Sequence, residues 1–202
     1  MRIGILGTGG MADALGTRWR RAGHEVVAGS RSQGGVREAA GSGTDAVLLA
    51  VPYEAAVEVV AGLEEVLRGR VLIDCTNPVG HPGFRLLTAG GPSAAERIAA
   101  AAPASRVVKA FNLCHEDVWR LTPPVFDGRP LAVPLCGDDE EALEVVRRLV
   151  RDLGCEPLNA GGLGRAGLLE ATAALLIGLW VGEGADAQAI APPLLPWAEP
   201  AA

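Results

Sequence analysis

Short apolar runs alternate with longer, charge-bearing segments along most of the chain, and this alternation limits the fold more than any other feature. The apolar runs are nearly continuous, which is typical of parallel strands that are covered on both faces. We therefore expect strands at Arg2–Leu6, Glu25–Ala28, Ala46–Val51, Val71–Asp74, Arg106–Lys109, Leu131–Leu135 and Cys155–Pro157.

Helical patterns fill most of the segments between these strands. They cover Gly10–Ala22, Tyr53–Leu67, Ser93–Ala101, Asp138–Asp152 and Arg165–Val181. Strands that alternate with helices predict an α/β fold with a doubly wound, mostly parallel sheet. We expect residues 1–182 to form this single domain and the Ala- and Pro-rich residues 183–202 to form a C-terminal tail.

A glycine-rich turn follows the first expected strand and opens the first helix. It has the G-x-G-x-x-G/A pattern of dinucleotide-binding folds and reads Gly7-Thr8-Gly9-Gly10-Met11-Ala12. Gly7 permits the tight turn, Gly9 lets the backbone approach a pyrophosphate, and Ala12 lets the helix pack closely on the sheet. The N–H groups around Gly10 and Met11 then point at the phosphates. These features predict a Rossmann-type dinucleotide site.

The end of the second strand favours NADP(H) over NAD(H) as the cofactor. NAD sites place Asp or Glu there to bond the ribose 2′-hydroxyl, whereas this chain has Ser30 and Arg31. Ser30 can donate its hydroxyl, and Arg31 can make a bidentate contact with a 2′-phosphate. Thr8, in the glycine turn, is expected near the same phosphate.

Three loops at the carboxyl ends of strands are expected to wall the nicotinamide ring, because ligands of open α/β sheets bind at that edge. Their candidate residues are Val51, Pro52, Asn77, Pro78, Ala110, Phe111 and Asn112. His115 is the only histidine placed where it can supply a proton, and it and Asn112 are weak candidates for contact with the reacting groups. The alternative is that His115 simply starts the next helix, so the catalytic residue stays open.

Charge and cysteine usage argue against several other classes. The net charge of −6 disfavours nucleic-acid binding. The four cysteines are widely spaced, which predicts a reducing, cytoplasmic setting and no zinc site. The single tyrosine, Tyr53, has no lysine four residues later, which disfavours a short-chain dehydrogenase. We see no secretory signal, and the apolar run Ala171–Gly182 is short for a bilayer, so we expect no membrane partner but a buried helix or a dimer seam.

Several segments together resemble the F420-dependent NADP oxidoreductase family. The matching segments are Arg2–Ala12, Gly23–Arg31, Asp74–Pro78, Val107–Asn112, Cys136–Glu141 and Leu153–Gly162. The resemblance implies an oxidoreductase that passes a hydride between NADP(H) and the deazaflavin coenzyme F420. It also implies that Thr8, Ser30 and Arg31 hold the 2′-phosphate, and that the chain forms a homodimer through the apolar helix Arg165–Val181.

Two other functions stay open at this stage. The chain is either an NADPH-dependent reductase of another acceptor, such as a free flavin or a small carbonyl or imine compound, or a non-catalytic NADPH-binding sensor. In the first case His115 or Asn112 would contact the substrate. Hydride exchange with a flavin-like ring mainly needs orientation and exclusion of water, whereas reduction of a ketone or imine more often needs a positioned proton donor.

Overall fold

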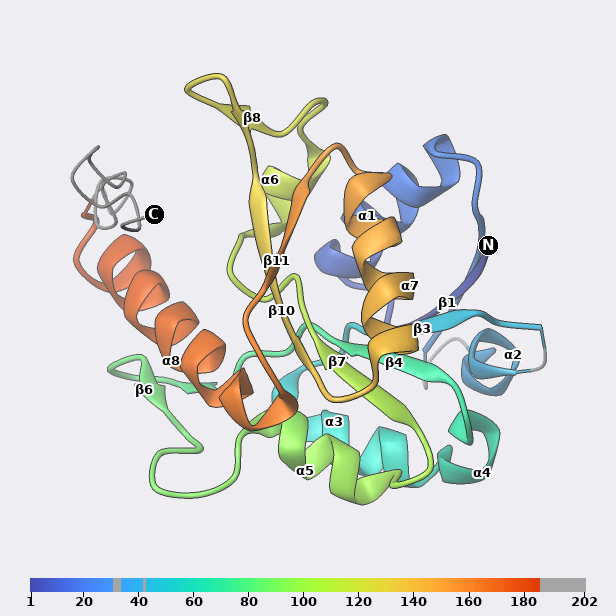
Figure 1. The fold of residues 1–202 in the computed structure, drawn as a ribbon. Helices are drawn as coiled ribbons and strands as arrows, with labels where there is room; N and C mark the ends of the chain where they lie inside the picture. Colours follow the sequence, from blue (N-terminus) through green and yellow to red (C-terminus); the bar gives the residue numbers. More distant parts are fainter. Residues whose placement is uncertain (31–33, 42, 186–202) are drawn as a thin grey trace, which may run out of the picture.

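A seven-stranded sheet forms the centre of the molecule, with helices on both faces (Figure 1). The computed structural model describes residues 1–30, 34–41 and 43–185. The strand order is β11-β10-β7-β4-β3-β1-β2. These strands are β1 (Arg2–Leu6), β2 (Glu25–Gly29), β3 (Ala46–Leu49), β4 (Val71–Asp74), β7 (Arg106–Lys109), β10 (Ala132–Gly137) and β11 (Glu156–Asn159).

Five neighbouring strands run parallel, and the last two are reversed. The parallel ladder runs β2-β1-β3-β4-β7. Strand β10 pairs antiparallel with β7, with Cys136 opposite Lys109, and β11 runs parallel to β10. The doubly wound, mostly parallel sheet is thus confirmed, and the reversal is a feature that the apolar runs did not indicate.

Two apolar cores flank the sheet. One lies under α1 (Gly10–Arg21), α6 (Glu116–Arg120) and α7 (Glu140–Arg151), and it contains Trp19. The other lies under α2 (Val36–Ala40), α3 (Tyr53–Ala61), α5 (Ala94–Ala101) and α8 (Ala166–Ile177). Each sheet face is therefore covered, which explains why the strands are apolar on both sides.

Local sequence signals account for several helix boundaries. The Asp139 side chain accepts a hydrogen bond from the Ala142 N–H and caps α7, and Ser93 forms a capping box with Glu96 at the start of α5. The expected helix Tyr53–Leu67 is divided into α3 and α4 (Glu64–Leu67), because α3 ends at Gly62. A long helix was predicted there since the apolar spacing continues across this glycine.

Short elements connect these parts. They are β5 (Val79–Gly80), β6 (Arg85–Leu86), β8 (Val125–Phe126), β9 (Arg129–Pro130), the 3-10 turn η1 (Leu163–Arg165) and the π-helical turn η2 (Gly178–Gly182). With η1 and η2, helix α8 forms a stretch, Leu163–Gly182, that is long and apolar enough to cross a membrane by length and composition alone. It is longer than the apolar run seen in the sequence. Its inner face packs on α5, with Leu169 and Glu170 buried.

Candidate functional site

The glycine turn between β1 and α1 has the geometry of a nucleotide-binding turn. Gly7 has φ +129°, and a side chain there would collide with the carbonyl oxygen of Ala50, so the fold itself requires glycine. Gly9 differs, because it has φ −80° and a Cβ there would meet no atom of the described residues within 4 Å. The described part of the fold does not need a glycine at position 9, so its missing side chain leaves room for a ligand.

The first cavity lies beside this turn and has a volume of about 380 Å³. Its lining comes from the turn, the end of β2 and the β3–α3 connection, namely Leu6, Gly7, Thr8, Gly9, Ser30, Val36, Ala50, Val51, Pro52, Ala55 and Val59. Ser30 closes its own short loop, since its N–H donates to the carbonyl oxygen of Gly34 (3.0 Å). Arg31, the predicted 2′-phosphate ligand, lies outside the described residues.

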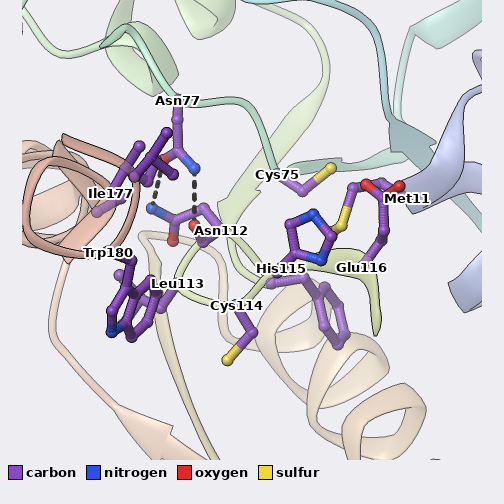
Figure 2. A pocket seen from close by; sticks show the side chains of 13 residues that line it. Met11, Cys75, Asn77, Asn112, Leu113, Cys114, His115, Glu116, Ile177 and Trp180 are labelled. Carbon is purple, nitrogen blue, oxygen red and sulfur yellow. Dashed lines mark hydrogen bonds between the residues drawn. The ribbon is translucent and has the colours of Figure 1, made fainter. Parts of the chain in front are cut away.

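A second cavity, of about 270 Å³, lies beside Met11 in the first turn of α1 (Figure 2). Residues from α1, from the loops after β4 and β7, from the start of α6, and from α8 with η2 line it. They are Met11, Cys75, Asn77, Phe111, Asn112, Leu113, Cys114, His115, Glu116, Ala173, Ile177, Trp180 and Val181. The lining is largely apolar and aromatic, with a few polar groups, as small-molecule sites usually are.

Two amide side chains join the loops that line the second cavity. The Asn112 Nδ2 donates to Asn77 Oδ1 (2.9 Å) and to the carbonyl oxygen of Leu169 on α8 (3.2 Å), while Asn77 Nδ2 donates to the carbonyl oxygen of Asn112 (2.7 Å; Figure 2). These bonds fix the orientation of the Asn112 amide, whose buried Oδ1 has no hydrogen-bond partner among the described residues. These hydrogen bonds hold the loops after β4 and β7 and helix α8 in fixed positions relative to one another.

Phe111 is held in an unusual backbone conformation at the end of β7. Its φ is +63°, in the left-handed region that non-glycine residues seldom adopt, and its side chain is buried. The ring packs edge-on against Trp19 and Trp119, with centroid separations of 5.7 Å and 5.4 Å. Such conformations persist where the surroundings enforce them, often at functional sites. Here the backbone conformation of Phe111 places the following residue, Asn112, next to Asn77.

The predicted site residues divide between the two cavities. The first cavity contains Gly7, Thr8, Gly9, Ser30, Val51 and Pro52, and the second contains Met11, Asn77, Phe111, Asn112 and His115. Four of the predicted residues line neither cavity. Ala12, Pro78 and Ala110 are buried, and Gly10 faces the carboxylate of Glu116, which occupies the space that a side chain would need.

His115 starts helix α6, which was the simpler of its two expected roles. Its Nδ1 accepts a hydrogen bond from the Asp117 N–H (3.3 Å), and the side chain is 66% exposed while still reaching the cavity rim. The ring nitrogen that caps the helix is therefore engaged by the backbone. Among the described residues, no group of three or more His, Cys, Asp or Glu side chains is arranged to hold a metal ion.

Sequence reasoning missed the far wall of the second cavity and its thiols. The wall consists of Ala173, Ile177, Trp180 and Val181, which no local motif marks. Burial and the charge of Asp74 raise the pKa of Cys75 to about 12, and burial raises the pKa of Cys114 to about 11. Both thiols are therefore protonated at neutral pH, which makes them poor nucleophiles.

The fold and the glycine turn define a Rossmann-type dinucleotide-binding protein, with ligand cavities at the carboxyl edge of a mostly parallel sheet. Residues 2–78 match the family model described as NADP oxidoreductase, coenzyme F420-dependent. This match supports the resemblance read from the sequence.

Relatives differ in how much of their length this chain covers. It is 34% identical over 141 residues to the F420-dependent NADP reductase of Methanocaldococcus jannaschii, covering 67% of this chain and 61% of that protein. It is 32% identical over 191 residues to the metalloreductase STEAP3 of Rattus norvegicus, covering 89% of this chain and 38% of that protein. A solved structure from Arthrobacter sp. FB24 shares the fold, with a TM-score of 0.80 and 24% identity, over 92% of this chain and 96% of that one.

Proposed function

We propose that this chain is an NADP-dependent oxidoreductase that transfers a hydride between NADP(H) and coenzyme F420. The observation that carries the proposal is a pair of cavities, one lined by Gly7, Thr8 and Gly9 of the glycine turn and the other by Met11, two residues further on. The first cavity suits the adenosine ribose and its 2′-phosphate. The second, which is apolar and bordered by amides, suits the nicotinamide and a second flat ring.

Cofactor recognition in the proposal rests on the first cavity. Gly9 leaves the space over the turn open, and the start of α1 directs backbone N–H groups toward it. Thr8 and Ser30 border this cavity with hydroxyl groups, and Arg31 follows Ser30 in the sequence. No carboxylate lines this cavity among the described residues, so a 2′-phosphate would meet no like charge there.

The second cavity supports exchange between two rings better than reduction of a carbonyl or imine. NADP(H), when bound, supplies or takes up the hydride, and the protein has to orient the rings and exclude water. Met11, Ile177 and Trp180 offer apolar faces for this purpose, while Asn77 and Asn112 mark one edge. Reduction of a carbonyl or imine would additionally need a proton donor, and the titratable lining groups besides the two thiols are His115 and Glu116.

Oxidation of NADPH by the purified protein tests the proposal directly. F420, FMN, FAD and riboflavin are offered in parallel, with NADH in place of NADPH as the control. Turnover with F420 alone is the expected result. Turnover with a flavin alone would favour the alternative acceptor, and NADPH binding without any turnover would favour a sensor.

We also propose that residues 1–182 act as one domain, that the protein works in the cytoplasm, and that two copies associate through α8. The proposed dimer is supported by apolar side chains on the outer face of this helix. Leu168 and Leu175 are 57% and 56% exposed, which is unusual for large apolar side chains on one helix. A second copy of the same helix would cover them.

A further inference from the structure

Three charged side chains are completely buried together under the loops of the second cavity. Lys109 at the end of β7, Asp74 at the end of β4 and Glu170 on α8 each have no exposed surface. The Lys109 Nζ lies 2.8 Å from Asp74 Oδ2 and 3.1 Å from Glu170 Oε1, and it donates to the carbonyl oxygen of Thr76 (2.6 Å). The cluster thus joins the C-terminal helix to two central strands.

Glu170 also holds the start of a second helix. Its Oε2 accepts a hydrogen bond from the Ala94 N–H (2.9 Å) and its Oε1 accepts one from the Ala95 N–H (3.2 Å), both in the first turn of α5. Thr88 Oγ1 donates to the same carboxylate at 3.4 Å. An anion is stabilised at a helix N-terminus, so this carboxylate is paired with both a lysine and a helix.

The face of α8 that carries Glu170 is the face that lines the second cavity. Ala173, Ile177 and Trp180 follow Glu170 at intervals of three, seven and ten residues, which is the spacing of one helical stripe. Asn112 adds a second tie one residue away, since its Nδ2 donates to the carbonyl oxygen of Leu169. Because the Glu170 end of this stripe is fixed, the position of Ile177 and Trp180 in the second cavity is fixed as well.

We propose that Glu170 is a positioning residue that holds α8 against Lys109 and α5, so that Ala173, Ile177 and Trp180 form the wall of the second cavity. The identity of the rings rests on the proposed function. Buried ion pairs are often no more stabilising than apolar residues of the same size, whereas in some proteins they specify one arrangement of the groups they join. Stability alone therefore does not explain why three charges are buried here.

The test compares two ligands that differ in the cavities they fill. Adenosine 2′,5′-bisphosphate probes the first cavity, and NADPH probes both, so the ratio of their Kd values measures the contribution of the second cavity. In the Glu170→Gln variant we expect the Kd of NADPH to rise about tenfold, while that of the bisphosphate changes less than about twofold. Glu183→Gln, the same change at an exposed position of the following turn, is the matched control and should alter neither value.

A milder variant, Thr88→Val, removes one donor from the same carboxylate and serves if Glu170→Gln does not fold. It should shift the ratio in the same direction by a smaller factor. An equal rise in the Kd of both ligands, or no change in the ratio in a folded variant, would overturn the proposed role of Glu170. A wild-type protein that binds NADPH no more tightly than the bisphosphate would overturn it as well.

Binding rather than turnover is measured, so failure of F420 as the acceptor leaves this result readable. Where F420 is turned over, its KM provides a second readout. We expect the Glu170→Gln variant to raise the KM for F420 more than it lowers kcat, because the displaced wall weakens binding of the ring. A variant that lowers kcat alone would contradict a positioning role.

Discussion

Gly7 and Gly9 show how two identical residues, two positions apart, serve different purposes. Gly7 adopts a backbone conformation that is strained for other residues and has no room for a side chain, whereas Gly9 has an ordinary conformation and, among the described residues, open space where a Cβ would lie. The first glycine is required by the fold, and we propose that the second is required by a ligand. The motif alone does not separate these two requirements, because both positions read as glycine.

We therefore expect Gly9→Ala to fold normally and to bind NADPH poorly. The added methyl group meets no atom of the described residues, and alanine in place of glycine at a helix N-cap costs about 1 kcal/mol. The methyl group does occupy the approach to the pyrophosphate, so the Kd of NADPH should rise at least about tenfold. Calorimetric titration and urea unfolding measure the two effects.

Gly7→Ala is the matched control for this experiment. It should destabilise the protein by more than about 2 kcal/mol, because the new side chain collides with the backbone at Ala50 and the φ angle is unfavourable. If Gly9→Ala destabilises the fold as much as Gly7→Ala does, the ligand explanation for Gly9 is wrong.

We expect Arg31 to determine the preference of the protein for NADPH over NADH. The Arg31→Ala variant should weaken NADPH binding by about 1.5–3 kcal/mol, the range for hydrogen bonds to charged groups. NADH binding should hardly change, since NADH has no 2′-phosphate. Equal losses for NADPH and NADH would refute the assignment, and fluorescence titration of both cofactors decides it.

At the scale of elements, strands and helices could be predicted wherever one apolar pattern covers the whole element. Helix α7 and the central strands follow from such patterns, and the glycine turn follows from a motif that is contiguous in the sequence. The first cavity was predictable for the same reason, because most of its lining lies next to that motif or next to strand ends. Apolar runs do not encode strand direction, so the reversal of β10 was not predictable.

The second cavity was only half predictable. Asn77, Phe111 and Asn112 follow buried strands and were expected at this edge, whereas Ile177 and Trp180 arrive from a helix at the other end of the described chain. Tertiary contacts, among them those of Glu170 and the bond from Asn112 to Leu169, place that helix beside the cavity. A buried glutamate in an apolar helix was the available signal, and it points to a partner without naming it.

The outer face of α8 carries the prediction of a dimer. Leu175 is exposed on this face, whereas Leu176 and Leu179 are half-buried, so Leu175 is the position to test. Leu175→Asp should convert a dimer to a monomer in sedimentation experiments, because it places a charge in an apolar seam. Leu175→Ala is the control and should weaken association less. A wild-type protein that sediments as a monomer would dismiss the dimer.

For the molecule as a whole, buried thiols predict a loss of stability in alkali. Burial, with the charge of Asp74, raises the pKa of Cys75 from 9.0 to about 12 in the folded state. The unfolded chain therefore releases this proton first, so stability is retained below pH 9 and falls as the pH rises from 9 toward 12. By pH 10, Cys75 alone should account for about 1.4 kcal/mol of lost stability.

Urea unfolding at pH 8 and pH 10 measures this effect. The free energy of unfolding of the wild type should fall more between these pH values than that of Cys75→Ala, although the variant is less stable at pH 8. The comparison of slopes removes the cost of the lost side chain. Identical slopes would show that Cys75 ionises equally in the folded and unfolded states.

The reversal of β10 has a consequence for how this scaffold can be redesigned. Because β10 runs against β7, the connection that leaves it opens beside Arg106, at the edge opposite the ligand cavities. The second cavity is therefore closed on this side by α8 and η2 rather than by the loop that follows β10. A small combinatorial library at Ala173, Ile177 and Trp180 would test new hydride acceptors in the second cavity. The residues that line the first cavity, more than a hundred residues earlier in the chain, would stay unchanged.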